Sequence, residues 1–231
     1  MNFNFSNIIY GISNKMDGSM RIDGGFEKIG LENRKRLFER YKINNLRNIK
    51  IKQCHGINVV VLDRYIEDKI ECADGIITSE KEVILSVTVG DCLPVYFYDP
   101  AKEIIGIAHA GWKGVIDNIS KNMISKMIES FGSNPQDIVV NIGPHIRDCH
   151  FEVKSDLVDI FKKYKEQIIK KDEKFYINLG KVVERQLVES GVKFQNIIFS
   201  EKCTHCDKSL FSFRRDKPKD VEVMLAFIAK I

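Results

Sequence analysis

The chain has 231 residues, which is long enough to bury a core of its own, and its 44% hydrophobic and 29% charged residues are ordinary for a globular protein. Its net charge of +4 comes without a dense basic block interleaved with aromatics, so composition gives no support for a nucleic-acid-binding protein. No stretch approaches 18 apolar residues and the N-terminus lacks the regions of a signal peptide, so we expect neither a membrane span nor secretion. Six cysteines are few for this length, which favours a reduced, cytoplasmic protein over a disulfide-bonded one.

The first half of the chain predicts one helix followed by a series of strands. Residues 26–42 have the charge and apolar pattern of an amphipathic helix. Asp99-Pro100 is a turn signal, so the two runs that flank it are predicted to form a hairpin. Five apolar runs have the length and composition of strands: Val59–Leu62, Gly75–Thr78, Ile84–Val89, Leu93–Tyr98 and Ile104–His109.

The second half predicts more helix. One apolar face recurs at helical spacing after Gly114, formed by Val115, Ile116, Ile119, Met123, Met127 and Phe131. Further helices are predicted around 157–161 and 179–188, with strands at 137–143, 196–200 and 221–229. No linker rich in Pro, Gly or Ser divides the chain. We therefore predict a single domain, residues 1–231, of the α+β or layered α/β class.

A cysteine and a histidine stand beside glycine at the ends of the predicted hairpin. Cys92 in GDCLPV precedes one strand and His109 in HAGWKG ends the next, so hairpin pairing predicts that they lie close together. Such a pair can act as nucleophile and base. Alternatively the two can bind zinc, which accepts mixed nitrogen and sulfur ligands. Taken singly, each residue is more often structural than functional.

Three cationic residues, one of them just after the predicted hairpin, each allow two interpretations. Lys113, between Gly111 and Gly114, could receive an anion at a helix N-terminus, or the segment could be a tight turn with Trp112 as a core plug. Arg214 and Arg215 could clamp a phosphate by bidentate hydrogen bonds, or form an exposed basic turn.

A second set of cysteines and histidines lies in the C-terminal third. Cys203 and Cys206 have Cys-x-x-Cys spacing, and Cys149 with His150 could complete a structural zinc site. Such sites usually join two close ligand pairs around a small loop, whereas more than 50 residues of predicted helix separate these pairs. We therefore predict that Cys203 and Cys206 do not bind a second metal ion.

Six motifs in chain order, spread over residues 52–216, resemble those of one family: QCHG, ADGIIT, GDCLPV, HAGWKG, IGPHIRDCHFEV and CTHCDKSLFSFRRD. The sequence resembles the laccase-domain proteins of the multicopper polyphenol oxidase type, which are now regarded as purine nucleoside phosphorylases of broad specificity. The resemblance implies a layered α/β/β/α fold related to cysteine hydrolases of the deamidating-toxin type. It also implies that His55, Cys92 and His109 are both the catalytic residues and the ligands of a zinc ion.

The activities implied are phosphorolysis of adenosine, inosine and S-methyl-5'-thioadenosine, together with adenosine deamination. The partners would be a purine nucleoside and phosphate, with no nucleic acid and no membrane, and we expect a monomer. Cys54 stands where the family usually has valine, a departure that leaves substrate preference open. Within or beside the motifs, our candidates for substrate binding are Gln53, Asp91, Trp112, Lys113, His145, Arg214 and Arg215.

Four alternatives stay open from the sequence. Some bacterial members of the family are described as peptidoglycan editing factors, which would make the protein an amidase acting on peptidoglycan precursors. A metal-free hydrolase would use Cys92 as nucleophile and His109 as base, but would leave His55 without a role. A partner protein with structural zinc would need four ligands, where only three good ones are found. A copper polyphenol oxidase is the weakest alternative, since copper clusters need many paired histidines and the chain has five.

Overall fold

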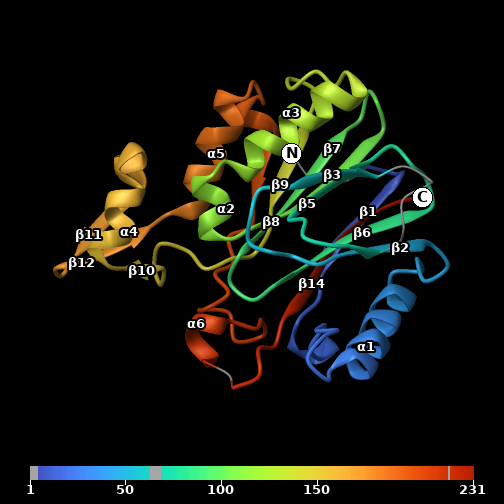
Figure 1. Cartoon of the computed structure of the whole chain (residues 1–231), viewed down its shortest axis with the longest axis horizontal. Coiled ribbons are helices and arrows are strands. Elements are labelled where there is room, and N and C mark those ends of the chain that lie inside the picture. The colour runs from blue at the N-terminus through green and yellow to red at the C-terminus, as the bar shows by residue number, and fades with distance from the viewer. Residues whose placement is uncertain (1–4, 63–68, 218) are drawn as a thin grey trace.

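Two β-sheets are stacked at the centre of the protein, and helices cover both outer faces (Figure 1). We describe it from a computed structural model that defines residues 5–62, 69–217 and 219–231. In order across the first sheet, the strands are β1 (Ile8–Ile12), β14 (Met224–Lys230), β6 (Val83–Val89), β2 (Arg47–Ile51) and β4 (Lys69–Ile70). Across the second, they are β13 (Ile197–Phe199), β9 (Val139–Ile142), β7 (Leu93–Asp99), β8 (Ile104–Ala110), β5 (Gly75–Thr78) and β3 (Val59–Leu62).

Three apolar layers hold the stack together. Between the sheets, Leu85 and Ile228 of the five-stranded sheet share a core with Tyr96 and Ile107 of the six-stranded sheet. The outer face of the six-stranded sheet packs against α2 (Trp112–Ile116), α3 (Ile119–Phe131) and α5 (Leu179–Glu189). The outer face of the five-stranded sheet packs against α1 (Glu27–Arg40). The α/β/β/α fold expected from the sequence is therefore confirmed.

This layering explains which strands could be predicted from the sequence. The six-stranded sheet is covered on both faces, so β7 and β8 are buried at every position and read as continuous apolar runs. All five strands predicted between residues 59 and 109 are present, with ends within one residue of the prediction. β1 and β2 are mostly half-buried and were missed.

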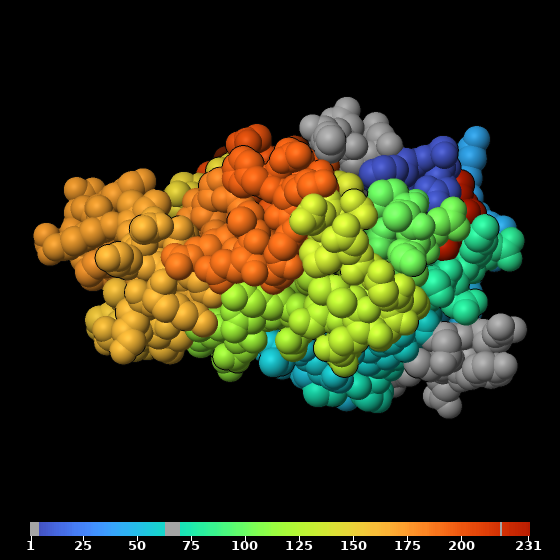
Figure 2. Space-filling view, turned by 90° about the horizontal axis from the view of Figure 1, so that it is seen from above, coloured from blue at the N-terminus to red at the C-terminus, as the bar shows by residue number. Residues whose placement is uncertain are grey.

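A small lobe lies at one end of the longest axis, beyond the helices over the six-stranded sheet (Figures 1 and 2). It consists of α4 (Ser155–Ile160) and a three-stranded sheet of β10 (Glu152–Val153), β12 (Lys174–Ile177) and β11 (Ile168–Lys171). The helices predicted around 157–161 and 179–188 are present as α4 and α5, but the three strands of the lobe were missed, so the expectation of mostly helix between residues 150 and 203 was wrong. The remaining short elements are α6 (Phe213–Asp216) and the 3₁₀ turns η1 (Lys15–Asp17), η2 (Lys162–Gln167) and η3 (Phe194–Asn196).

The helix predicted after Gly114 is divided in the structure. Asn118 has a left-handed backbone conformation with φ of 68°, which ends α2 after five residues and starts α3 in a new direction. The apolar positions before and after the break still pack on the same sheet, which is why the sequence pattern reads as one helix. Within the described ranges, no helix is long and apolar enough to cross a membrane.

The chain passes from one sheet to the other at two neighbouring places. β2 and β6 are parallel neighbours in the five-stranded sheet, so they end at the same edge. Residues 52–58 lead from β2 into β3 of the six-stranded sheet, and residues 90–92 lead from β6 into β7. β8 pairs antiparallel with β7, with Ala110 opposite Leu93, so β8 ends where β7 begins. Both crossings and the end of β8 thus meet at one edge of the stack.

Candidate functional site

Three candidate residues meet at this edge of the stacked sheets. His55 lies in the first crossing, Cys92 ends the second, and His109 is the penultimate residue of β8. One ligand atom from each lies within 4.8 Å of the other two. The imidazole rings of His55 and His109 are perpendicular, with centroids 4.7 Å apart. The proximity of Cys92 and His109 agrees with the hairpin pairing expected from the sequence, and His55 joins them from the first crossing, while the catalytic and metal-binding roles of all three stay a prediction.

Asp74, which sequence reasoning missed, fixes two of these residues. Its Oδ1 lies 2.8 Å from Nδ1 of His109 and accepts the backbone N–H of His55 at 3.0 Å. Its Oδ2 accepts the backbone N–H of Gly56 at 2.7 Å and that of Cys54 at 3.2 Å. The carboxylate is fully buried. It therefore holds the turn that carries His55, whose φ of 57° is left-handed, and orients the His109 ring.

The surroundings of Cys92 and His109 favour a thiolate on Cys92 and a protonated imidazole on His109. Burial raises the pKa of the Cys92 thiol, but His109 and His55 outweigh it and lower that pKa to about 6. Burial lowers the pKa of His109, but Cys92 and Asp74 raise it to about 9. Burial raises the pKa of Asp74, while hydrogen bonds from His109, Gly56 and Cys54 lower it to about 2. The arrangement is thus suited to holding Cys92 as a thiolate, the form that attacks carbon or binds metal.

Gly111 leaves space directly against the three side chains. A Cβ at this position would lie 3.3 Å from Cys92 Sγ, 3.3 Å from His55 Cδ2 and 3.6 Å from His109 Cε1. Two imidazoles and one thiolate form a donor set that suits zinc and leaves a fourth position for another ligand. The residues present therefore fit one metal ion, with Gly111 keeping side-chain atoms away from it.

We expect Gly111→Ala to weaken metal binding and activity while leaving the fold intact. The added methyl group would crowd Cys92 and His55 at contacts tighter than ordinary van der Waals distance. Gly111 has an ordinary extended backbone, with φ of −70°, so alanine introduces no backbone strain. Zinc affinity by chelator competition and Tm by calorimetry would be measured together. Unchanged zinc affinity would show that the space beside Gly111 is not used.

Gln53 and Asp91, both substrate candidates, are occupied in structural hydrogen bonds. The Gln53 amide bonds to the backbone and side chain of Thr88, which joins the first crossing to β6. Asp91 accepts the Thr204 hydroxyl at 2.6 Å and the backbone N–H of Arg214 at 2.7 Å. These contacts position the crossings that carry His55 and Cys92, and the predicted role of Gln53 and Asp91 in substrate binding stays a prediction.

His145 and Arg215 are also engaged within the protein. His145 is 2% exposed, and its Nδ1 is 2.8 Å from the carbonyl oxygen of Gly143. Burial lowers its pKa to about 4. The Arg215 guanidinium donates to backbone carbonyls of residues 204, 205, 207 and 210 and pairs with Asp216. Arg214 is less committed, with its Nη1 on the carbonyl of Glu152 at 2.9 Å. Arg215 therefore holds its own loop, and the phosphate-binding role of Arg214 and Arg215 stays a prediction.

Trp112 and Lys113 follow Gly111 at the start of α2. Trp112 is half-buried and packs against the core of the six-stranded sheet, which agrees with its reading as a core plug. Lys113 is exposed, and its ammonium lies 5.7 Å from the Trp112 ring centroid. Because α2 is only five residues long, the helix dipole gives little support to anion binding here.

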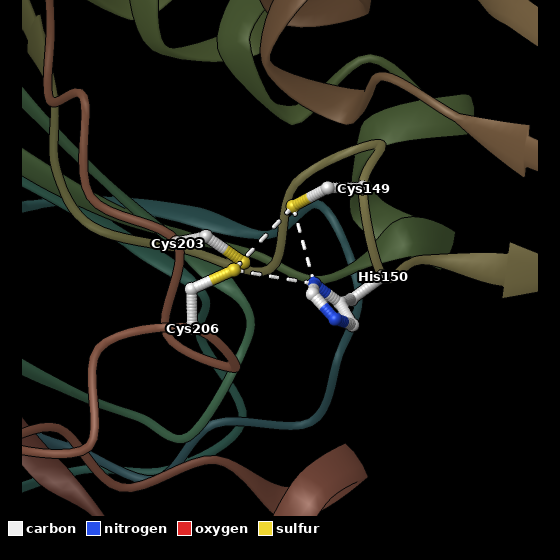
Figure 3. A group of neighbouring side chains, drawn as sticks. All are labelled: Cys149, His150, Cys203 and Cys206. Carbon is white, nitrogen blue, oxygen red and sulfur yellow. Dashed lines mark hydrogen bonds between the residues drawn. The ribbon is translucent and has the colours of Figure 1, made fainter.

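A second group of side chains that could bind a metal ion lies elsewhere in the structure. Ligand atoms of Cys149, His150, Cys203 and Cys206 all lie within 4.8 Å of one another (Figure 3). The reason for expecting no second metal site, the distance between the two ligand pairs along the chain, was therefore wrong. The sequence signal was present in the Cys-x-x-Cys spacing, but the contact between the two loops could not be predicted from it.

The sequence matches the family described as multi-copper polyphenol oxidoreductase laccase over residues 17–230. The chain belongs to this family. It is 36% identical over 163 residues to a Bacillus subtilis protein named purine nucleoside phosphorylase YlmD, a match that covers 67% of this chain and 58% of that relative. It is 33% identical to purine nucleoside phosphorylase CA_C1699 of Clostridium acetobutylicum, covering 81% of this chain and 83% of that one. The crystal structure of YlmD from Geobacillus stearothermophilus superposes with a TM-score of 0.88 at 27% identity, covering 98% and 93% of the two chains.

The copper in the family's description does not suit the residues at this site. Multi-copper clusters need many histidines, and only His55 and His109 of the five histidines lie here. His145 bonds to a backbone carbonyl, and His150 stacks on His205 with ring centroids 3.8 Å apart. As a laccase-domain protein, this chain thus offers three donors for a single ion.

Proposed function

We propose that the protein is a purine nucleoside phosphorylase acting on adenosine, inosine and S-methyl-5'-thioadenosine at a zinc site of His55, Cys92 and His109. In phosphorolysis, a phosphate oxygen bonds to C1' of the sugar as the bond from C1' to the purine nitrogen breaks. The products are the free base, which takes up a proton, and ribose 1-phosphate or its methylthio counterpart. We also propose adenosine deamination, in which water replaces the 6-amino group to give inosine and ammonia.

The convergence of His55, Cys92 and His109 beside Gly111 carries the proposal. It agrees with the names of the similar relatives in Bacillus subtilis and Clostridium acetobutylicum, both called purine nucleoside phosphorylases. The fold, which superposes on that of a YlmD protein over nearly its full length, supports it as well.

The residues of the chain have separable tasks in this proposal. Asp74 holds Nδ1 of His109, so that Nε2 is the nitrogen available to Cys92 or to a metal ion. When bound, zinc would supply a Lewis acid with an open coordination position. Asp74 also fixes the backbone around His55, and Gly111 leaves room for substrate atoms. Trp112, which is half-buried, would stack on the purine, and Lys113, which is exposed, would pair with phosphate.

Incubation with adenosine, with and without phosphate, tests the proposed function. Adenine and ribose 1-phosphate formed only with phosphate would support phosphorolysis, and inosine formed in either condition would support deamination. Protein that retains its zinc and yields neither product from adenosine, inosine or methylthioadenosine would contradict the proposal.

We expect Lys113→Ala to reduce phosphorolysis more than deamination, because only phosphorolysis requires bound phosphate. The expected loss in kcat/KM for phosphorolysis is about tenfold, the effect of losing one exposed charge-assisted contact. Lys126→Ala is the matched control, since this lysine pairs with Glu129 on α3. Equal losses in both activities would rule out the phosphate role of Lys113.

A metal-free cysteine hydrolase is the second candidate. It is favoured by the spatial arrangement in which Asp74 contacts the His109 ring and His109 lies beside the Cys92 thiol. A carboxylate that orients a histidine beside a thiolate is the arrangement of a cysteine nucleophile with its base. His55→Ala separates the candidates. A hydrolase of this kind would contain no metal at Cys92 and would keep part of its activity, since His109 still lowers the pKa of the thiol, whereas the zinc phosphorylase would lose both metal and activity.

A further inference from the structure

Cys149, His150, Cys203 and Cys206 form a compact cluster at the surface, remote from the His55 crossing in the chain (Figure 3). The Cys149 and Cys206 sulfurs are 3.8 Å apart, and Nδ1 of His150 lies 3.2 Å and 3.3 Å from them. In a tetrahedral zinc site with Zn–S bonds of about 2.3 Å and Zn–N bonds of about 2.0 Å, sulfurs are about 3.8 Å apart, and sulfur and nitrogen about 3.5 Å. The cluster thus has nearly the dimensions of a closed tetrahedral site.

Backbone hydrogen bonds hold the two loops of this cluster together. His145 and Cys203 form an isolated parallel bridge, with the Thr204 N–H donating to the His145 carbonyl at 3.1 Å. The Arg147 N–H donates to Cys203 Sγ at 3.5 Å. The loops that present the four ligands are therefore ordered by contacts that involve no metal ion.

The chemistry of the cluster indicates a metal ligand set rather than a hydrogen-bonded surface group. Thiols are weak donors and weak acceptors, so contacts among three of them stabilise little. Cys149 and Cys206 are exposed, and exposed free thiols are prone to oxidation unless something occupies them. Three thiolates and one imidazole are the ligands of structural zinc sites, in which all four positions come from the protein.

We propose that Cys149, His150, Cys203 and Cys206 bind a structural zinc ion, separate from the metal of the His55 site. The ion joins the loop after β9 to the loop after β13. The second of these loops also carries Thr204, whose hydroxyl holds Asp91 at 2.6 Å, next to Cys92 in the chain. The structural zinc therefore stabilises the loop that buttresses the second crossing. This site does not depend on the proposed phosphorylase activity.

Zinc content per chain tests this site. We would purify wild type, Cys206→Ser, Cys92→Ala and the double variant without added metal and measure zinc by mass spectrometry. The proposal predicts that Cys206→Ser lowers the zinc content by one ion per chain, in the wild-type and in the Cys92→Ala background alike, and lowers Tm by several degrees. Cys72→Ser is the matched control, because Cys72 is exposed and lies outside both clusters.

A second measurement covers the case in which Cys206→Ser does not fold. X-ray absorption at the zinc edge of Cys92→Ala would show three sulfur ligands and one nitrogen if the cluster binds zinc. A folded Cys206→Ser with wild-type zinc content would overturn the proposal. So would a Cys92→Ala protein without zinc, or a native disulfide between two of the three cysteines. None of these readouts uses activity, so failure of the proposed function leaves this test unaffected.

Discussion

Cys92→Ala is expected to abolish phosphorolysis and deamination together, with each kcat/KM falling by more than about 100-fold. Loss of outer partners alone costs metal sites 10- to 100-fold, and Cys92 is a direct ligand in the proposal. Its sulfur is the only one in the cluster with His55 and His109. The variant should also lose the zinc ion of this site while keeping the fold, since the residue is half-buried and alanine fits the same backbone. Both activities on adenosine and the zinc content would be measured on the same preparation.

Cys72→Ser provides the control for this prediction, because it removes an exposed thiol outside both of the candidate metal clusters and keeps a hydroxyl in its place. An active Cys92→Ala protein would refute the site itself. Loss of activity with unchanged zinc content would instead favour the metal-free hydrolase, in which Cys92 is a nucleophile. Loss of one activity alone would show that phosphorolysis and deamination do not share the site.

The part of the site that lies on the hairpin could be predicted from the sequence. β7 and β8 are adjacent in the chain and buried on both faces, so their apolar runs and the turn at Asp99 are visible, and pairing them brings Cys92 near His109. The position of His55 beside Cys92 and His109 could not be predicted from the hairpin. That position depends on β2, a mostly half-buried strand with two basic residues that pairs with β6, and β2 was not predicted.

Contacts between segments that are far apart in the sequence were the least predictable part of the structure. Asp74 stands in the ADGIIT motif, but its role depends on β5 pairing with β8, which places it beside His109 across 35 residues of sequence. The cluster of Cys149 and Cys203 likewise depends on the parallel pairing of β13 with β9, which brings together two loops that are distant in the sequence. Bidentate hydrogen bonding suggested Arg214 and Arg215 as a phosphate clamp, and the sequence did not show that the Arg215 guanidinium donates to four carbonyls of its own loop. Residue type indicates the chemistry available, but tertiary pairing decides which residues remain free for it.

Asp74→Asn is the most informative change at an outer partner of the site. Asp74 accepts hydrogen bonds on both oxygens, from His109 and the His55 N–H on Oδ1, and from the Gly56 and Cys54 N–H groups on Oδ2. An asparagine has only one oxygen, so its NH₂ group must face donors on one side. If it faces Gly56, the turn that carries His55 is repelled.

If the asparagine NH₂ group instead faces His109, Nδ1 must become the acceptor, and the proton moves to Nε2, the nitrogen that a metal would need. In either orientation we expect zinc affinity and kcat/KM to fall about 10- to 100-fold. This is the usual effect of removing a hydrogen-bond partner of a metal ligand. Asp99→Asn is the control: Asp99 is also fully buried and caps the turn at the far end of the same hairpin, but only its Oδ1 accepts hydrogen bonds. Its amide oxygen can keep these bonds, so both quantities should stay near wild type. Wild-type zinc affinity and activity in Asp74→Asn would show that the carboxylate neither orients His109 nor holds the His55 turn in the working enzyme.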